Sequence, residues 1–366
     1  MNDQFLQHAL DQRRAVHAYR QLTLARGLVD FSSNDYLGIA RNKLAAKEIG
    51  DEFSNYRHGS GGSRLITGNS IIAEETEKQI ALFHEAEAAL LFNSGYDANL
   101  GLLSAVPQRG DHILYDQFSH ASIRDGIRLS FASAFSFAHN SVEDLEKKLQ
   151  LPCSGRRFVV TESVFSMHGD QPPLERFVAL CERYDAYLII DEAHAIGIVG
   201  DRGEGLTQSL NLHKRVFARV FTFGKAGGCH GACVAGSARL RDYLINFSRA
   251  FIYTTALPEA SIAAIQAFYR LFPAMQTERK YLCDQIQRFQ QAPIQYHRPL
   301  SLTPIQVVVI PGNEEVKQTE RKLHSAGLHV KAIMYPTVPK GEERLRIVFH
   351  SFNTPADVNQ LIECLK

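Results

Sequence analysis

The stretch Tyr187-Leu-Ile-Ile-Asp191-Glu-Ala-His194 decides the class of fold. An uninterrupted apolar run that ends in an acid is typical of a strand buried on both faces, with the acid at its carboxyl end. Ligands of open α/β sheets bind at that edge, so Asp191 is a candidate for a binding site. The alternative is that Asp191 only caps a following helix.

Similar apolar runs recur through the first two thirds of the chain, with stretches long enough for a helix between most of them. They are 89–92, 112–115, 158–161, 188–191, 216–222 and 232–235. The alternation predicts an α/β fold with a mostly parallel sheet covered by helices on both faces.

The pattern changes from about Pro258, where a long helical region extends to about Gln291. After it, the order strand, helix, strand, strand, helix is predicted for 304–310, 316–325, 328–334, 345–349 and 355–365. The periodicity also predicts a helix over 3–24. We therefore expect three parts: an N-terminal helical segment that packs with the small domain (1–35), a large α/β domain (36–270) and a small C-terminal α+β domain (271–366).

Composition excludes several classes of function. The chain has 366 residues, with 40 basic and 39 acidic side chains and a net charge of +1. No global field therefore attracts nucleic acid or an anionic membrane. The start lacks a signal-type apolar run and no run of about 18 apolar residues occurs, so we expect a cytoplasmic protein. The six cysteines include no CxxC pair and are expected to stay reduced.

A lysine and an acid suggest the chemistry. Lys225 lies among small residues in Thr222-Phe-Gly-Lys225-Ala-Gly-Gly, after a predicted strand. Such a setting can strip water from the ammonium and lower its pKa, which suits a Schiff base; a solvated loop lysine is the alternative. Asp191 could keep a pyridine nitrogen protonated, with His194 in reach of a phenolic oxygen. No second histidine stands at ligand spacing from His194, so we expect no metal.

Two further segments could complete a cofactor site. Asn93-Ser-Gly95-Tyr96-Asp-Ala-Asn99 lies between a strand and a helix, where backbone amides can hold a phosphate; a plain turn would look similar. His120 could lie flat over a ring, although an isolated histidine is more often structural. Amine, carboxylate, phosphate donors and a flat group are the four things that pyridoxal phosphate (PLP) requires of its protein.

The order of these segments resembles that of the α-oxoamine synthases, a branch of the fold-type I PLP enzymes, over nearly the whole chain. Besides the segments with Gly95, Asp191 and Lys225, the matching blocks are Asp30-Phe-Ser-Ser-Asn34-Asp-Tyr-Leu-Gly38, Gly59-Ser-Gly-Gly-Ser63-Arg-Leu-Ile-Thr-Gly68, Asp116-Gln-Phe-Ser-His120-Ala-Ser122, Thr161-Glu162-Ser-Val-Phe-Ser166-Met and Phe251-Ile-Tyr-Thr254-Thr255-Ala-Leu-Pro258. The resemblance implies a homodimeric enzyme that condenses an amino acid with an acyl thioester.

The resemblance also implies a role for each matching residue. It makes Lys225 the Schiff-base lysine, Asp191 the partner of the pyridine nitrogen and His120 the histidine stacked on the ring. The remaining implied roles are contact with the phenolic oxygen (His194, Ser166), contact with the phosphate (Gly95, Tyr96, Thr222, and Thr254 or Thr255 from the other subunit), binding of the amino-acid carboxylate (Arg346) and positions near the substrates (Asn34, Glu162).

Two blocks are most similar to the member of this family that serves biotin synthesis. They are Gly59-Ser-Gly-Gly-Ser-Arg and Leu10-Asp-Gln-Arg13-Arg14-Ala. That member joins L-alanine to a pimeloyl thioester of coenzyme A or acyl carrier protein, and Arg20 matches an arginine near the far carboxylate of its product. The chain departs from the family at Cys229, Cys233 and His168.

Other functions remain open at this stage. Glycine C-acetyltransferase, aminolevulinate synthase and the sphingolipid-type synthase belong to the same family. A catalytically silent subunit should have lost the lysine or its aspartate, and this chain keeps both. A dinucleotide enzyme is disfavoured because Gly59-Ser-Gly-Gly does not follow a clear strand in a GxGxxG arrangement.

Overall fold

The computed structural model describes residues 3–16, 18–22, 24, 27–43, 46–47 and 56–366. The chain divides into two compact units. One consists of 37–166 and 171–277, and the other of 1–36, 167–170 and 278–366. We call them the large unit and the small unit.

The large unit is built on a sheet in which, among the described residues, seven strands have the order β2-β8-β7-β6-β5-β3-β4. Among these strands only β8 runs in the direction opposite to the others, which confirms the mostly parallel sheet. The strands are β2 (Ala88–Phe92), β3 (His112–Asp116), β4 (Ser133–Phe137), β5 (Arg157–Glu162), β6 (Ala186–Asp191), β7 (Ala218–Thr222) and β8 (Ala232–Gly236).

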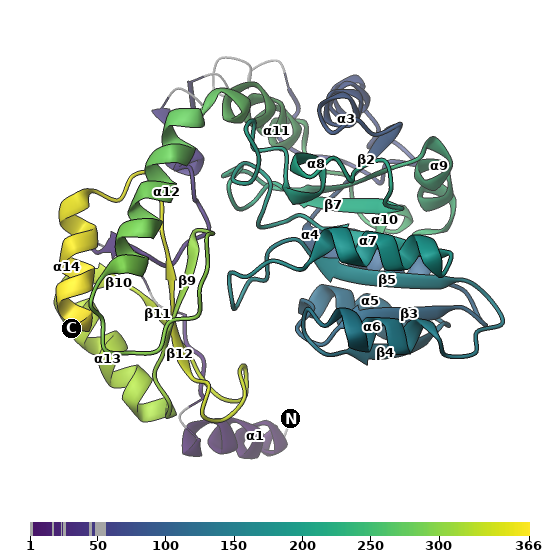
Figure 1. The fold of residues 1–366 in the computed structure, drawn as a ribbon. Coiled ribbons are helices and arrows are strands. Elements are labelled where there is room, and N and C mark those ends of the chain that lie inside the picture. The colour runs from purple at the N-terminus through teal and green to yellow at the C-terminus, as the bar shows by residue number, and fades with distance from the viewer. Residues whose placement is uncertain (1–2, 17, 23, 25–26, 44–45, 48–55) are drawn as a thin grey trace. The chain divides into compact units, whose positions relative to one another are not determined.

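Helices cover both faces of this sheet, as Figure 1 shows. Alternate residues of β2 enter different cores, since Ala89 and Leu91 belong to one and Leu90 and Phe92 to the other. The helices are α3 (Ile71–Phe83), α4 (Gly95–Ala105), α5 (Ala121–Leu129), α6 (Val142–Leu149), α7 (Leu174–Arg183), α8 (Leu206–Ser209), α9 (Ala238–Phe247), α10 (Arg249–Ile252) and α11 (Glu259–Leu271), with the short turns η1 (Ile39–Arg41) and η2 (Phe272–Ala274). Helices α3 and α11 pack against the sheet in the first core, and helices α4, α5, α9 and α10 pack against it in the second.

The small unit contains a sheet with the order β11-β12-β9 and a separate parallel pair, β1 with β10. Helix α13 packs against this sheet and against α14. The elements are α1 (Gln4–Ala15), β1 (Val29–Asp30), α12 (Gln276–Gln291), β9 (Ile305–Val309), α13 (Asn313–Ser325), β10 (Leu328–His329), β11 (Lys331–Ile333), β12 (Arg344–Val348) and α14 (Pro355–Leu365).

Three elements of the structure differ from the elements that the sequence predicts. The N-terminal helix ends at Ala15, whereas the sequence predicted a helix over 3–24, a range of which residues 17 and 23 lie outside the described residues. None of the side chains of this helix is buried, so no packed face extends it. The helical region after Pro258 breaks around Pro273, which has no N–H for the helix ladder. The segment 328–334 is divided between two sheets, because β10 pairs with β1 and β11 with β12.

No helix within the described ranges has both the length and the apolar character needed to cross a bilayer. The six cysteines are free thiols. Among the described residues, no cluster of His, Cys, Asp and Glu side chains has a metal-binding arrangement.

Candidate active site

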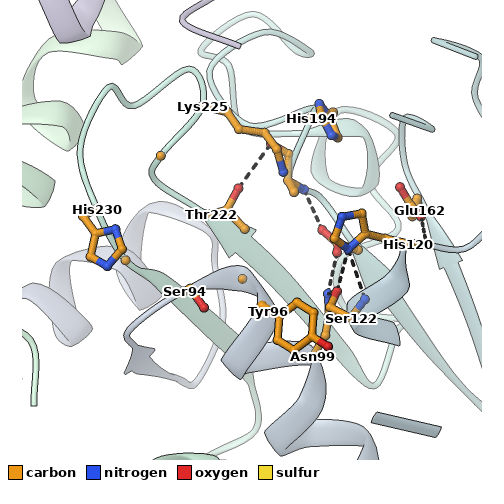
Figure 2. Close-up of a pocket in the computed structure, with 15 residues that line it drawn as sticks. Ser94, Tyr96, Asn99, His120, Ser122, Glu162, His194, Thr222, Lys225 and His230 are labelled. Carbon is orange, nitrogen blue, oxygen red and sulfur yellow. Dashed lines mark hydrogen bonds between the residues drawn. The ribbon is translucent and has the colours of Figure 1, made fainter. Parts of the chain in front are cut away.

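A cavity of about 230 Å³ opens at the carboxyl ends of the parallel strands of the large unit. Figure 2 shows Lys225, His194, His120 and Thr222 around it. Its lining consists of Ser94, Gly95, Tyr96, Asn99, His120, Ser122, Glu162, Asp191, Ala193, His194, Thr222, Gly224, Lys225, His230 and Gly231. The residues that the sequence singled out on four separate segments therefore meet in one place.

Asp191 is the last residue of β6, as the apolar run predicted. Its side chain is 6% exposed and is held from two sides. The Ala193 amide donates to Oδ1 at 2.9 Å and the Asn99 side-chain amide donates to Oδ2 at 2.7 Å. A buried carboxylate fixed in this way presents a negative charge to whatever occupies the cavity.

Glu162 is a second buried carboxyl group in the cavity. It ends β5 and pairs in register with Asp191 on the neighbouring strand. Burial, reinforced by the nearby Asp191 charge, raises the pKa of Glu162 to about 8. One oxygen, Oε1, accepts the His120 backbone N–H at 2.6 Å. Two adjacent buried carboxyl groups do not both ionise readily, and the raised pKa favours the protonated form of Glu162 near neutral pH.

The start of α4 forms an anion-binding end of the cavity. Ser94 caps the helix, with its hydroxyl accepting the Asp97 amide at 3.1 Å and its carbonyl accepting the Ala98 amide. The earlier amides of Gly95 and Tyr96 have no acceptor within a helix and lie at the cavity. A Cβ on Gly95 would overlap the Thr222 methyl group, so only glycine allows this close approach. A phosphate fits here through backbone amides and the helix dipole.

Lys225 follows β7 and reaches the same cavity. Its neighbours Phe223 and Ala226 are fully buried and hold this loop in the core. His194 is 5% exposed and also lines the cavity.

Arg346 and Asn34 lie together in the small unit. Arg346 is a β12 residue, 8% exposed, and its guanidinium donates to Asn34 Oδ1 at 2.9 Å. Burial lowers the pKa of Arg346, although Tyr36, whose own pKa burial raises, offsets part of this effect. Arg20, also in the small unit, is exposed.

The remaining predicted residues lie elsewhere in the large unit. Ser166, Thr254 and Thr255 are not among the described residues that line this cavity. Asn93 fixes the position of the two threonines, because its side-chain amide donates to Thr254 Oγ1 at 2.9 Å and to the Thr255 carbonyl at 2.8 Å. Their roles stay predictions.

Three further residues line the cavity although the sequence does not mark them as site residues: Asn99, Ser122 and His230. Asn99 stands four residues after Gly95 and Ser122 two after His120, so helical spacing could have found the first and the N-terminal turn of α5 the second. The two cysteines that depart from the family pattern, Cys229 and Cys233, have structural roles. Cys233 is buried in β8, and burial raises the pKa of Cys229 to about 12, so that thiol stays protonated.

The donor set fits PLP: an amine, a buried carboxylate, free amides at a helix N-terminus and an imidazole face one cavity. The strand order and this site define a fold-type I PLP-dependent enzyme.

Comparisons with known proteins agree with this class. The model of the aminotransferase class I and II family matches residues 26–365. The 8-amino-7-oxononanoate synthase of Emericella nidulans is 40% identical, with 98% of this chain and 94% of that protein covered. The 8-amino-7-oxononanoate synthase 2 of Bacillus subtilis is 37% identical, with 99% and 96% covered. The chain belongs to the aminotransferase class I and II family and, within it, to the α-oxoamine synthases.

Solved structures show the same relationship. The serine palmitoyltransferase of Sphingomonas wittichii has a TM-score of 0.92 at 26% identity and covers 99% of this chain and 96% of its own. The 8-amino-7-oxononanoate synthase of Francisella tularensis has a TM-score of 0.79 at 29% identity, with 92% and 96% covered. Another neighbour is a serine palmitoyltransferase with bound PLP. The cofactor of this chain is accordingly PLP.

Proposed function

We propose that this protein condenses L-alanine with a pimeloyl thioester to give 8-amino-7-oxononanoate, carbon dioxide and the free thiol carrier, a step of biotin synthesis. The observation that carries the proposal is the likeness, over 98% of the chain, to a curated protein of that name at 40% identity. The meeting of Lys225, Asp191, His194 and His120 in one cavity supports it, since a silent subunit would not need all four.

The residues predicted from the sequence have separate tasks in this proposal. PLP, when bound, supplies the aldehyde that holds the amino acid and a ring that accepts electrons from its α-carbon. Asp191 holds the pyridine nitrogen protonated, and Nζ of Lys225 accepts the proton from the α-carbon. The amides of Gly95 and Tyr96, with Thr222, bind the phosphate. His194 and Ser166 contact the phenolic oxygen, and His120 covers the ring.

Arg346 and Asn34 bind the carboxylate of the amino acid. The Arg346 fork already points at an acceptor, the Asn34 carbonyl oxygen, and a carboxylate is a stronger one. Arg346→Lys removes the bidentate geometry and should raise KM for the amino acid about 10-fold or more. Glu162 lies near the amino acid, and Arg20 near the far carboxylate of the acyl group.

The assembly is proposed to be a homodimer in the cytoplasm. Thr254 or Thr255 of one subunit then contacts the phosphate in the site of the other. An isologous interface forms two equivalent sites of this kind. The acyl carrier is coenzyme A or acyl carrier protein, and the carrier protein would be a transient partner.

Product analysis by mass spectrometry tests the function. Purified enzyme is incubated with alanine, glycine or serine, each with pimeloyl-coenzyme A or pimeloyl-acyl carrier protein, and Lys225→Ala serves as the control. The proposal predicts 8-amino-7-oxononanoate from alanine with at least one pimeloyl carrier. The likeness to serine palmitoyltransferases favours serine with a long-chain thioester as the second candidate, so palmitoyl-coenzyme A is included. Turnover of that pair alone would contradict the proposal.

A further inference from the structure

Asn99 and Ser122 connect two residues of the cavity that the proposed function uses separately. The Asn99 side-chain amide donates to Asp191 Oδ2 at 2.7 Å and to Ser122 Oγ at 3.0 Å. Ser122 Oγ lies 2.8 Å from Nδ1 of His120. A continuous set of hydrogen bonds therefore extends from Asp191 to His120. We call Asn99 and Ser122 the amide–hydroxyl bridge.

The bridge lies inside the protein. Asn99 is 2% exposed and Ser122 is 1% exposed. Helices α4 and α5 approach closely there because residue 126 is glycine, and a Cβ on Gly126 would lie 2.9 Å from the Asn99 carbonyl oxygen. Buried polar groups that lose a partner are costly, so the two side chains have little freedom to choose others.

Chemistry fixes the direction of the two hydrogen bonds that Asn99 makes. An ionised carboxylate only accepts, so Asn99 must present its NH2 group to Asp191. The same NH2 group supplies the second hydrogen to Ser122 Oγ, which is therefore an acceptor from Asn99. The single hydroxyl hydrogen of Ser122 is then free to point at Nδ1 of His120, and in that arrangement Nδ1 is an acceptor and carries no proton.

A second observation leads to the same state of His120. His120 is the N-cap residue of α5, and its Nδ1 accepts the Ser122 backbone N–H at 3.2 Å. Two donors of Ser122, the amide and the hydroxyl, therefore converge on one ring nitrogen. A proton on Nδ1 would remove this acceptor and leave the Ser122 backbone N–H, which cannot turn away, facing another N–H group.

We propose that Asn99 and Ser122 are positioning residues that fix His120 as the uncharged tautomer with its proton on Nε2. The flat ring that covers the cofactor is then neutral, and the bridge sets its orientation relative to Asp191. A charged imidazole would instead compete with the pyridine nitrogen for the Asp191 charge. The catalytic use of the tautomer depends on the proposed function. The tautomer itself does not, so the two can fail separately.

The charged groups around His120 act in both directions. Partial loss of solvent is the largest effect and lowers the pKa of His120, although part of its side chain stays exposed. Lys225, from the loop after β7, lowers this pKa further, whereas Asp191 at the end of β6 and Asp125 on α5 raise it. Glu162 at the end of β5 contacts the His120 backbone and is protonated near neutral pH. The bridge adds to the effect of burial, because it stabilises only the neutral ring.

Nuclear magnetic resonance of the PLP-loaded enzyme, labelled with 13C and 15N in histidine, measures the tautomer directly. His120→Gln assigns the signal. We expect an unprotonated Nδ1 and a protonated Nε2 in the parent enzyme across neutral pH. Ser122→Ala should raise the pKa of His120 by about one pH unit, the worth of one hydrogen bond, and should mix the tautomers. Asn99→Ala should shift the signal in the same direction by less, since the Ser122 hydroxyl remains.

Two further variants separate this role from a merely structural one. Ser163→Ala removes another buried hydroxyl beside Asp191, one that donates to its backbone carbonyl at 3.1 Å, and should leave the His120 signal unchanged. Ser122→Thr keeps the hydroxyl and should keep the parent tautomer. A proton on Nδ1 in the parent enzyme would overturn the proposal even if Ser122→Ala did not fold. An unchanged pKa and tautomer in a folded Ser122→Ala protein would overturn it as well.

Discussion

Glu162→Gln should change the pH dependence of the free energy of unfolding relative to the parent protein. Glu162 is 3% exposed, and its pKa is raised from 4.5 to about 8. Glutamine keeps the oxygen that accepts the His120 N–H, and it resembles the protonated acid in shape and charge. The substitution therefore removes the titration of this site, while the hydrogen bond from the His120 N–H is retained.

The sign follows from proton linkage. The folded protein binds the Glu162 proton more tightly than the unfolded chain, so this group favours folding most below pH 4.5. The contribution is lost as the pH rises toward the folded-state pKa of about 8. At about 1.4 kcal/mol for each unit of pKa difference, the loss between roughly pH 5 and pH 8 is on the order of 3 kcal/mol. The Gln variant should gain that amount relative to the parent over the same interval.

Urea unfolding of cofactor-free protein, at one protein concentration and at several pH values, measures this difference. Glu175→Gln is the matched control, because Glu175 is an exposed carboxylate on α7. This control measures what a surface Glu→Gln substitution alone does to the stability at each pH. A difference between Glu162→Gln and the parent that stays constant across the pH range would contradict the raised pKa, because Glu162 would then titrate alike in the folded and unfolded states.

The other predictions concern Asp191 and the subunit interface. Asp191→Asn should lower kcat about 100-fold or more because a charge is lost, whereas His194→Asn, which costs one hydrogen bond, should lower it about 10-fold; equal losses in steady-state assays would contradict these roles. If Thr254 or Thr255 contacts the phosphate of the opposite subunit, mixing inactive Lys225→Ala protein with an inactive double threonine mutant should restore part of the activity. Confirmed subunit exchange without activity would disprove the shared site.

The sequence was informative where a strand is buried on both faces. The run that ends at Asp191 predicted both a strand and the edge of the sheet at which the cavity lies. Edge strand β4 was missed, because four of its five residues, Ser133 to Ser136, are not buried and show no apolar run. The division of 328–334 between two sheets could not be predicted from the apolar pattern either, because it depends on pairing with β1, about 300 residues earlier in the chain.

The site could be predicted for residues that carry reactive groups and not for those that position them. Lys225, Asp191 and His120 stand in short motifs whose chemistry is recognisable. Asn99 and Ser122 are ordinary polar residues, and their importance arises only because the glycine at 126 lets α4 approach α5. The raised pKa of Glu162 likewise depends on its register with Asp191 across two strands, which a linear sequence does not show.

The proposed function requires that Lys225 holds PLP in the cavity of the large unit. Borohydride reduction of the purified enzyme, followed by proteolysis and mass spectrometry, would locate the cofactor on the chain. We expect a single modified peptide with the reduced cofactor on Lys225, and loss of the visible absorption of the lysine-bound cofactor in Lys225→Ala. A modified peptide that carries the cofactor on another lysine would contradict it.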